Sequence, residues 1–187
     1  MKKSVLLFFM MSLFSFPLKG REEKVKAIEL GLSMSSHLFL LSKTKISSHF
    51  KRKLTSSGSL VYNPIIRLSQ LKMEKEYYQK HTLLFFMDCL DLPSFGYAYS
   101  LGKELEGGHQ FGFALGAYLL DRKEWDRVVS RKEAHYFVAS KSLGITPILG
   151  IELNFKLFNI GEKFEFNLKN YFSFIFTSHT FTLDYLF

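Results

Sequence analysis

The sequence has little cysteine, tryptophan or proline, and it has no long apolar run beyond its first twenty residues. Cys89 is the only cysteine in 187 residues, so no disulfide can form within the chain. No later segment offers the roughly 18 consecutive apolar residues that a membrane-spanning helix needs. These absences exclude a disulfide-stapled secreted domain and a helical membrane protein.

Residues 1–20 have the pattern of a secretory signal peptide. Lys2 and Lys3 form a basic start, and residues 5–18 are an apolar core too short to span a bilayer comfortably. The segment before Gly20 lacks a clean cleavage triplet of small residues, so an uncleaved anchor is the alternative interpretation. We expect an exported protein, and for this reason we do not expect the net charge of +8 to serve nucleic-acid binding.

Residues 21–36 are predicted to form a short amphipathic helix ahead of the main domain. Val25, Ile28 and Leu32 fall close to one helical face, and most of the charged residues lie elsewhere. Such a helix could rest at a membrane interface. A polar linker is the alternative for this segment.

The remainder, residues 37–187, predicts an all-β domain, an eight-stranded antiparallel transmembrane β-barrel. At the end of the chain, Phe181, Leu183 and Tyr185 alternate strictly with Thr182 and Asp184. Apolar side chains on one face and polar ones on the other are typical of a strand between lipid and a lumen, and the 21 phenylalanines suit a lipid-facing surface. We expect strands at about 37–49, 59–71, 81–89, 95–101, 110–120, 148–157, from 163, and 178–187.

The predicted connections sort into two ends of the barrel. Short turns near 72–80, 103–108 and 159–162 fall at the end where the chain finishes, and we expect that end to face the periplasm. The other end carries the connections near 51–58, 90–94, 121–147 and 173–177, the third of which is the longest and belongs outside. The sequence thus predicts a monomer in the bacterial outer membrane.

Several polar residues gather at the predicted outer rim. His49, Asp88 and Cys89 end strands there, Asp121 follows another, and His179 begins the last. A histidine, a carboxylate and a thiol at one rim could form a base, an orienting group and a nucleophile. A merely solvated polar rim is the alternative.

Three stretches of the sequence resemble the lipid A palmitoyltransferase family. They are FMDCLDLPSFGYAY at 86–99, HQFGFALGAYLLDRKEW at 109–125 and TPILG at 146–150. The resemblance implies an enzyme that moves an acyl chain from phospholipid to lipid A. The sequence shows no spacing of metal ligands and no glycine-rich phosphate loop, so we expect no cofactor or metal. The resemblance also implies that His49, Asp88 and Cys89 are the catalytic residues. Cys89 stands where the family has serine, which puts the activity in doubt.

Basic residues in the predicted outer loops fit anionic lipid partners. Arginine and lysine form charge-assisted hydrogen bonds with phosphate groups, such as those of lipid A. The candidates for phosphate binding are Lys51, Arg52, Lys53, Arg122, Lys123 and Arg127. Outer loops next to lipopolysaccharide tend to be basic in any case, so this pattern favours a location more than a reaction.

A small outer-membrane barrel with a structural or adhesive role is the alternative to the acyltransferase. The predicted inward faces of the last three strands carry many charged and amide side chains. These residues are Glu152, Asn154, Lys156, Glu165, Asn167, Lys169 and Asp184. A salt-bridge network among them would plug the lumen, which an acyl-binding pocket would have to avoid.

Overall fold

The computed structural model describes residues 24–37, 61–87, 92–128, 136–173 and 176–187, and antiparallel strands dominate them. The eight long strands are β1 (Lys24–His37), β2 (Val61–Glu74), β3 (Tyr77–Met87), β4 (Pro93–Glu104), β5 (Gln110–Asp121), β7 (Leu143–Ile160), β8 (Phe164–Ser173) and β9 (Phe176–Leu186). Three short elements complete the described chain: the 3₁₀ turn η2 (Glu106–Gly108), the helix α3 (Arg122–Val128) and the two-residue strand β6 (Phe137–Val138).

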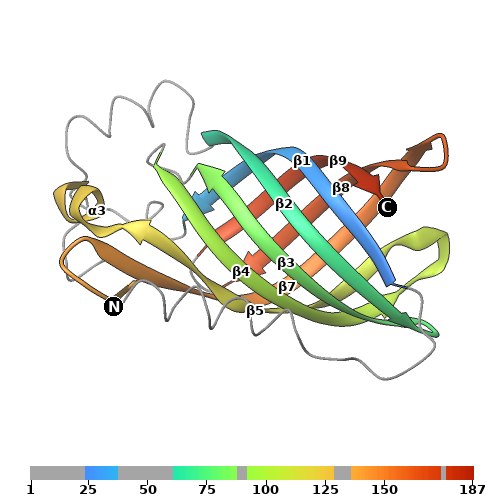
Figure 1. Ribbon diagram of the computed structural model, residues 1–187, viewed down its shortest axis with the longest axis horizontal. Helices are drawn as coiled ribbons and strands as arrows, with labels where there is room; N and C mark the ends of the chain where they lie inside the picture. Colours follow the sequence, from blue (N-terminus) through green and yellow to red (C-terminus); the bar gives the residue numbers. More distant parts are fainter. Residues whose placement is uncertain (1–23, 38–60, 88–91, 129–135, 174–175) are drawn as a thin grey trace.

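The eight long strands close into a barrel. Neighbouring strands pair in the order β5-β4-β3-β2-β1-β9-β8-β7, and a further pairing of β5 with β7 completes the circle. The strands run steeply tilted around the barrel axis, as Figure 1 shows. Closure leaves no long strand with an open edge, which is the requirement for a sheet in hydrocarbon. The predicted fold class is confirmed.

The two ends of the barrel differ as the sequence predicted. Turns after β2, β4 and β7 lie at the end where β9 finishes, which we call the turn end. Strands β1, β3, β5 and β8 end at the opposite end, the loop end, where α3 and β6 also lie. The short turns and the elements α3 and β6 are therefore at opposite ends of the barrel.

The start of the barrel corrects the sequence prediction. Residues 24–37 form β1, which pairs with β2 and β9, so the predicted amphipathic helix at 21–36 is wrong over its described part. Ile28 and Leu32 fit a helical face, but Leu30 lies between them and is also exposed, while Glu29 and Ser33 are buried. Exposed apolar residues therefore recur at every second position, which is the period of a strand. The barrel begins at Lys24 rather than at residue 37, and the predicted strand at 37–49 falls almost wholly outside the described residues.

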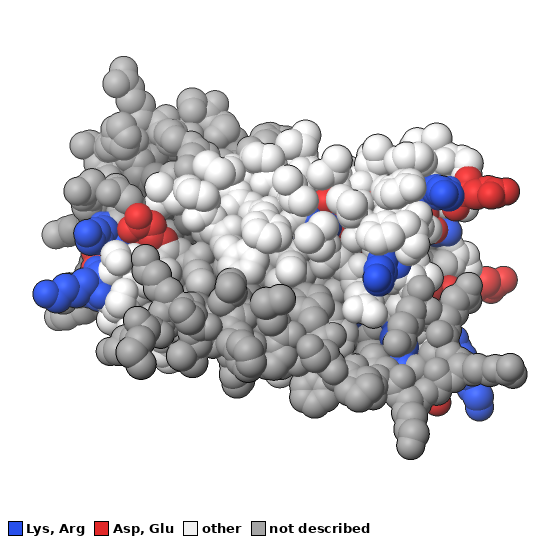
Figure 2. All heavy atoms as spheres, viewed as in Figure 1, with Lys and Arg blue, Asp and Glu red and all other residues white. Residues whose placement is uncertain are grey.

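The barrel has an apolar outside and a polar inside. Large apolar side chains on the outer surface are exposed on every strand, among them Leu30, Leu68, Phe113, Leu149 and Phe181. Charged atoms gather mainly at the two ends in the view of Figure 2. No helix in the described part of the chain is long and apolar enough to cross a membrane. Continuous apolar surface around a closed sheet indicates that the strands themselves span a bilayer.

Glycines on the inner face of β4 and β5 make room for one large ring. Tyr78 of β3 lies inside the barrel and is 1% exposed. A Cβ atom at Gly102 would lie 2.6 Å from the Tyr78 ring and 2.2 Å from the carbonyl oxygen of Phe111. A side chain at Gly102 would therefore displace both the ring and the neighbouring strand.

Candidate functional site

A buried ionic network fills the turn-end half of the lumen. Glu29 of β1 is at its centre: it accepts a hydrogen bond from Ser69 Oγ at 2.6 Å, and its Oε2 lies 2.7 Å from Lys169 Nζ. Lys169 also donates to Asp184 Oδ2 at 2.7 Å, and Asn167 Nδ2 donates to the same oxygen at 2.8 Å. Strands β1, β2, β8 and β9 are thereby joined through their side chains as well as through their backbones.

A second part of the network crosses the barrel interior. Lys80 of β3 forms an ion pair with Glu152 of β7, although these strands are not neighbours in the sheet. Ser100 Oγ of β4 donates to the other oxygen of Glu152 at 2.7 Å. The hydroxyls of Ser69 and Thr82 lie 3.2 Å apart, so β3 also contacts the group around Glu29 through a side chain.

The network is balanced in charge. Its cations are Arg67, Lys80 and Lys169, and its carboxylates are Glu29, Glu152 and Asp184. Burying a single charge without a partner costs several kcal/mol, so six charges can occupy one lumen only if they pair. The ion pair between Lys156 and Glu165, at 2.5 Å, follows the same rule nearer the turn end. Residues predicted to face inward on β7, β8 and β9 do line the lumen, as their burial and these contacts show.

A cavity of about 100 Å³ lies on the loop-end side of the network. The inward side chains change character there on five successive strands. Toward the loop end, Arg67 gives way to Ile65, Thr82 to Leu84, Ser100 to Ala98, Gly112 to Ala114, and Glu152 to Gly150 and Ile148. The opposite wall stays polar, because the hydroxyl groups of Ser33 and Ser178 form a hydrogen bond there, with their oxygens 3.0 Å apart. The cavity is therefore apolar on one side and polar on the other.

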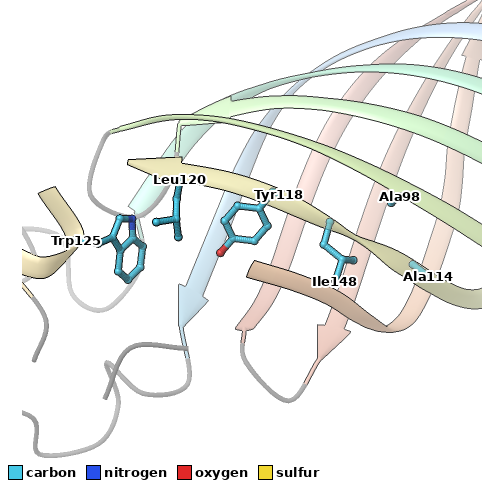
Figure 3. Close-up of a cluster of buried hydrophobic side chains, with 6 residues drawn as sticks. All are labelled: Ala98, Ala114, Tyr118, Leu120, Trp125 and Ile148. Atoms are coloured by element: carbon cyan, nitrogen blue, oxygen red, sulfur yellow. The ribbon is translucent and has the colours of Figure 1, made fainter. Parts of the chain in front are cut away.

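An apolar cluster closes the barrel between this cavity and α3. Ala98, Ala114, Tyr118, Leu120, Trp125 and Ile148 are all buried in it. Figure 3 shows the Trp125 ring reaching from α3 to lie beside Leu120, with Tyr118 and Ile148 further along the lumen. Trp125 is the only tryptophan of the chain. It anchors the one described helix to the barrel mouth.

Polar contacts hold the segment around α3 in place. Asp121 Oδ1 accepts a hydrogen bond from the backbone N–H of Lys123 at 2.9 Å, the usual geometry of a helix N-cap. Arg122 Nε lies 3.2 Å from Asp126 Oδ2, and Arg122 Nη1 donates to the carbonyl oxygen of Ser140 at 2.9 Å. Tyr136 donates a hydrogen bond to Asp126. Burial and this hydrogen bond raise the pKa of Tyr136.

Most of the predicted catalytic and phosphate-binding residues lie outside the described residues. This is the case for His49, Asp88, Cys89, Lys51, Arg52 and Lys53. Arg122 is buried and bonded to Asp126 and Ser140, whereas Lys123 is exposed on α3. Arg127 belongs to α3 by its backbone. The proposed arrangement of base, carboxylate and thiol stays a prediction.

The two other polar residues of the predicted rim have local partners. Asp121 caps α3, as described above. His179 lies opposite Asn170 in the pairing of β8 with β9, and its Nδ1 is 2.7 Å from Asn170 Oδ1. Its neighbours along β9, Ser178 and Thr180, are the residues that face the lumen. His179 therefore faces outward.

Sequence reasoning missed three members of the network: Glu29, Arg67 and Lys80. The helix predicted for residues 21–36 gives Glu29 no place on the inner face of a strand. Arg67 was already visible as a charge between Ile66 and Leu68, both of which are exposed outside the barrel. A charge that alternates with lipid-facing residues has to point inward, and this signal could have found Arg67 in the sequence.

Three features define the class of this protein: an apolar outside with a polar inside, a closed ring of paired strands, and a lumen filled by ion pairs. The chain is a small outer-membrane β-barrel. No family model and no curated protein matches the sequence. Among solved structures, Neisserial surface protein A (NspA) is similar over 90% of this chain and 98% of its own, with a TM-score of 0.48 and 8% identity. The N-terminal β-barrel domain of Pseudomonas aeruginosa OprF is similar over 86% of this chain and 97% of its own, with a TM-score of 0.35 and 8% identity.

Proposed function

We propose that this chain is a non-enzymatic, non-conducting barrel whose role is structural or adhesive. The observation that supports the proposal best is the ion pair between Lys80 and Glu152, which ties opposite walls of the lumen together. A continuous water path for ions would have to displace this pair and the hydrogen bonds around it. Opening such a path in a buried, balanced network costs several kcal/mol.

The loop end supports an adhesive role. Residues Phe137 and Val138 of β6 are 68% and 63% exposed, and β6 pairs with β7 where β8 no longer does. Asp126 holds this segment through Arg122 and Tyr136. An ordered, exposed apolar edge next to cationic residues such as Lys123 and Lys141 is a surface suited to contact with other molecules.

The acyltransferase remains the second candidate, because the apolar side of the cavity could hold hydrocarbon. Its size is the difficulty. A cavity of about 150 Å³ holds one benzene molecule, so about 100 Å³ corresponds to about four carbon atoms. A palmitoyl chain is four times as long. Transfer of such a chain from phospholipid to lipid A would require the apolar cluster around Tyr118 and Trp125 to open.

Mass spectrometry of lipid A separates the two candidates. Lipid A would be compared between cells with the chain, without it, and with His49→Ala, Asp88→Ala or Cys89→Ser. We expect identical lipid A in all of them, and we expect all three variants to restore the detergent resistance of the outer membrane as well as the parent does. An added acyl group that disappears with His49→Ala and Asp88→Ala would replace the structural role by the enzymatic one.

Ion conductance in planar bilayers tests the closed lumen separately. The purified barrel should insert without discrete channel openings. The variant Lys80→Ala/Glu152→Ala removes the link across the lumen and should admit small currents. Stable channels in the parent protein would contradict a plugged barrel.

A further inference from the structure

Arg67 is held less closely by carboxylates than Lys80 and Lys169 are. Lys169 has two carboxylates at 2.7 Å, and Lys80 is paired with Glu152. The nearest carboxylate oxygen to Arg67, Glu29 Oε2, lies 3.6 Å from Nη1, beyond hydrogen-bond distance. Nη2 donates a long bond of 3.3 Å to Thr180, and Nε is buried without a hydrogen-bond partner among the described residues.

The position of Arg67 directs these spare donors toward the cavity. Arg67 lines the cavity, and it is the last charged residue on β2 before the inner face turns apolar at Ile65. Leu84, its partner in the pairing of β2 with β3, lines the same space. A guanidinium with free N–H groups therefore lies at the base of a small space with an apolar wall.

We propose that this cavity binds a small monocarboxylate with a short hydrocarbon body. The carboxylate would accept a two-pronged pair of hydrogen bonds from Arg67, the geometry that a guanidinium fork favours. The hydrocarbon would point toward the loop end and pack against Leu84, Phe86 and Ile148. The site is independent of the structural or adhesive role. Its ligand would lie with the carboxylate toward the network, which is the reverse of an acyl chain that enters the lumen methyl end first.

The size of the cavity sets the length of the ligand. About 100 Å³ suits about four carbon atoms, on the scale of a 150 Å³ cavity that holds benzene. Because the network is already neutral, one bound anion leaves a net charge of −1 in the lumen. Binding therefore depends on Arg67, whose guanidinium lines the cavity and has a buried Nε without a hydrogen-bond partner among the described residues.

Trp125 gives a direct readout of binding and orientation. It is the only tryptophan, and it is buried in the cluster that shares Ala98, Ala114, Tyr118 and Ile148 with the cavity wall. The folded barrel in phosphatidylcholine nanodiscs would be titrated with 4-bromobutyrate, whose bromine quenches nearby tryptophan. Saturable quenching is expected, and it should be reversed by butyrate but not by the neutral butyramide. With the carboxylate at Arg67, 2-bromobutyrate should quench several-fold less than 4-bromobutyrate.

Variants decide whether Arg67 carries the site. Arg67→Gln should abolish saturable quenching, and Arg67→Lys, which keeps the charge but loses the fork, should weaken it at least several-fold. Ala98→Leu fills the cavity and should abolish binding with Arg67 intact. Lys103→Gln, an exposed cation on the outer surface, is the matched control and should bind as the parent does.

Three results would overturn the proposal. They are equal competition by butyramide and butyrate, unchanged quenching in Arg67→Lys and Ala98→Leu, and stronger quenching by 2-bromobutyrate. Heat-modifiable gel mobility would report folding of each variant. If Arg67→Gln does not fold, Arg67→Lys and Ala98→Leu still decide the outcome.

Discussion

Lys80 on β3 and Glu152 on β7 form an ion pair although four strands of the sheet separate them along one side and two along the other. Both side chains are almost fully buried, with relative exposures of 8% and 12%. The pair therefore joins walls of the barrel that no backbone hydrogen bond connects. Removing the pair should therefore lower the stability of the whole barrel.

Breaking this pair on one side should cost more than removing it entirely. Lys80→Met leaves Glu152 buried without its cation, and a loss of about 3–5 kcal/mol in the free energy of unfolding is expected. Lys80→Met/Glu152→Met should lose much less. Urea titrations in phosphatidylcholine vesicles would measure both. Lys103→Met, which breaks an exposed pair with Glu76, should change stability by less than about 1 kcal/mol. A double variant as unstable as the single one would contradict the argument.

An arginine on the outer surface should report depth in the bilayer. Leu115 is 61% exposed on the outer face of β5, several residues from either end of the strand, and Leu115→Arg should cost about 2–4 kcal/mol. Ile160 ends β7 beside a turn, and Ile160→Arg should cost about 0–1 kcal/mol. The same vesicle titration measures both. Equal costs would place the lipid-facing belt elsewhere.

Trp125 should contribute strongly to the free energy of unfolding, although it lies on a short helix. It is 2% exposed and packs with the apolar cluster at the barrel mouth. Trp125→Ala should lower the free energy of unfolding by about 3–5 kcal/mol, the usual cost of deleting a buried aromatic side chain. Trp125→Phe should cost clearly less. If both variants unfold like the parent, the cluster does not support the barrel.

Asp126 should control how firmly the loop-end segment is held. Asp126→Ala removes the acceptor of Tyr136 and the partner of Arg122, and it leaves the buried guanidinium with one fewer partner. We expect a loss of about 1–3 kcal/mol and faster cleavage of this segment by a protease in limited digestion. Lys123→Ala, on the same helix but exposed, is the control. Equal cleavage rates in the two variants would argue against the polar contacts around α3.

The strands with two clear faces could be predicted from the sequence. On β5, Phe111, Phe113 and Leu115 face out, and Gly112 and Ala114 face in, as the alternation predicts. Such a strand tolerates only one register, because a shift by one residue would turn every lipid-facing side chain into the lumen. Local pattern was therefore sufficient there.

The first strand and the network could not be predicted in the same way. Ile28 and Leu32 satisfy both a helical and a strand period, and only the pairing of β1 with β9 decides between them. Contacts such as Lys80 with Glu152 depend on how far the strands are staggered when the barrel closes. That stagger is a property of the whole ring. The alternation on β2 indicates that Arg67 faces inward, but no single strand carries a signal for the cavity or for the partners of this cation.

The seam between β1 and β9 has a consequence for folding. Ser33 and Ser178 meet across it although 145 positions separate them in the chain. Bringing the two ends of so long a segment together costs about 4 kcal/mol in chain entropy before the first bond of the seam forms. Until then β1 and β9 each expose a row of unpaired backbone groups that hydrocarbon does not tolerate. The barrel must therefore form its last pairing and enter the membrane as one event, and Gly31, where a Cβ would lie 2.5 Å from the carbonyl oxygen of Phe181, keeps that final contact sterically open.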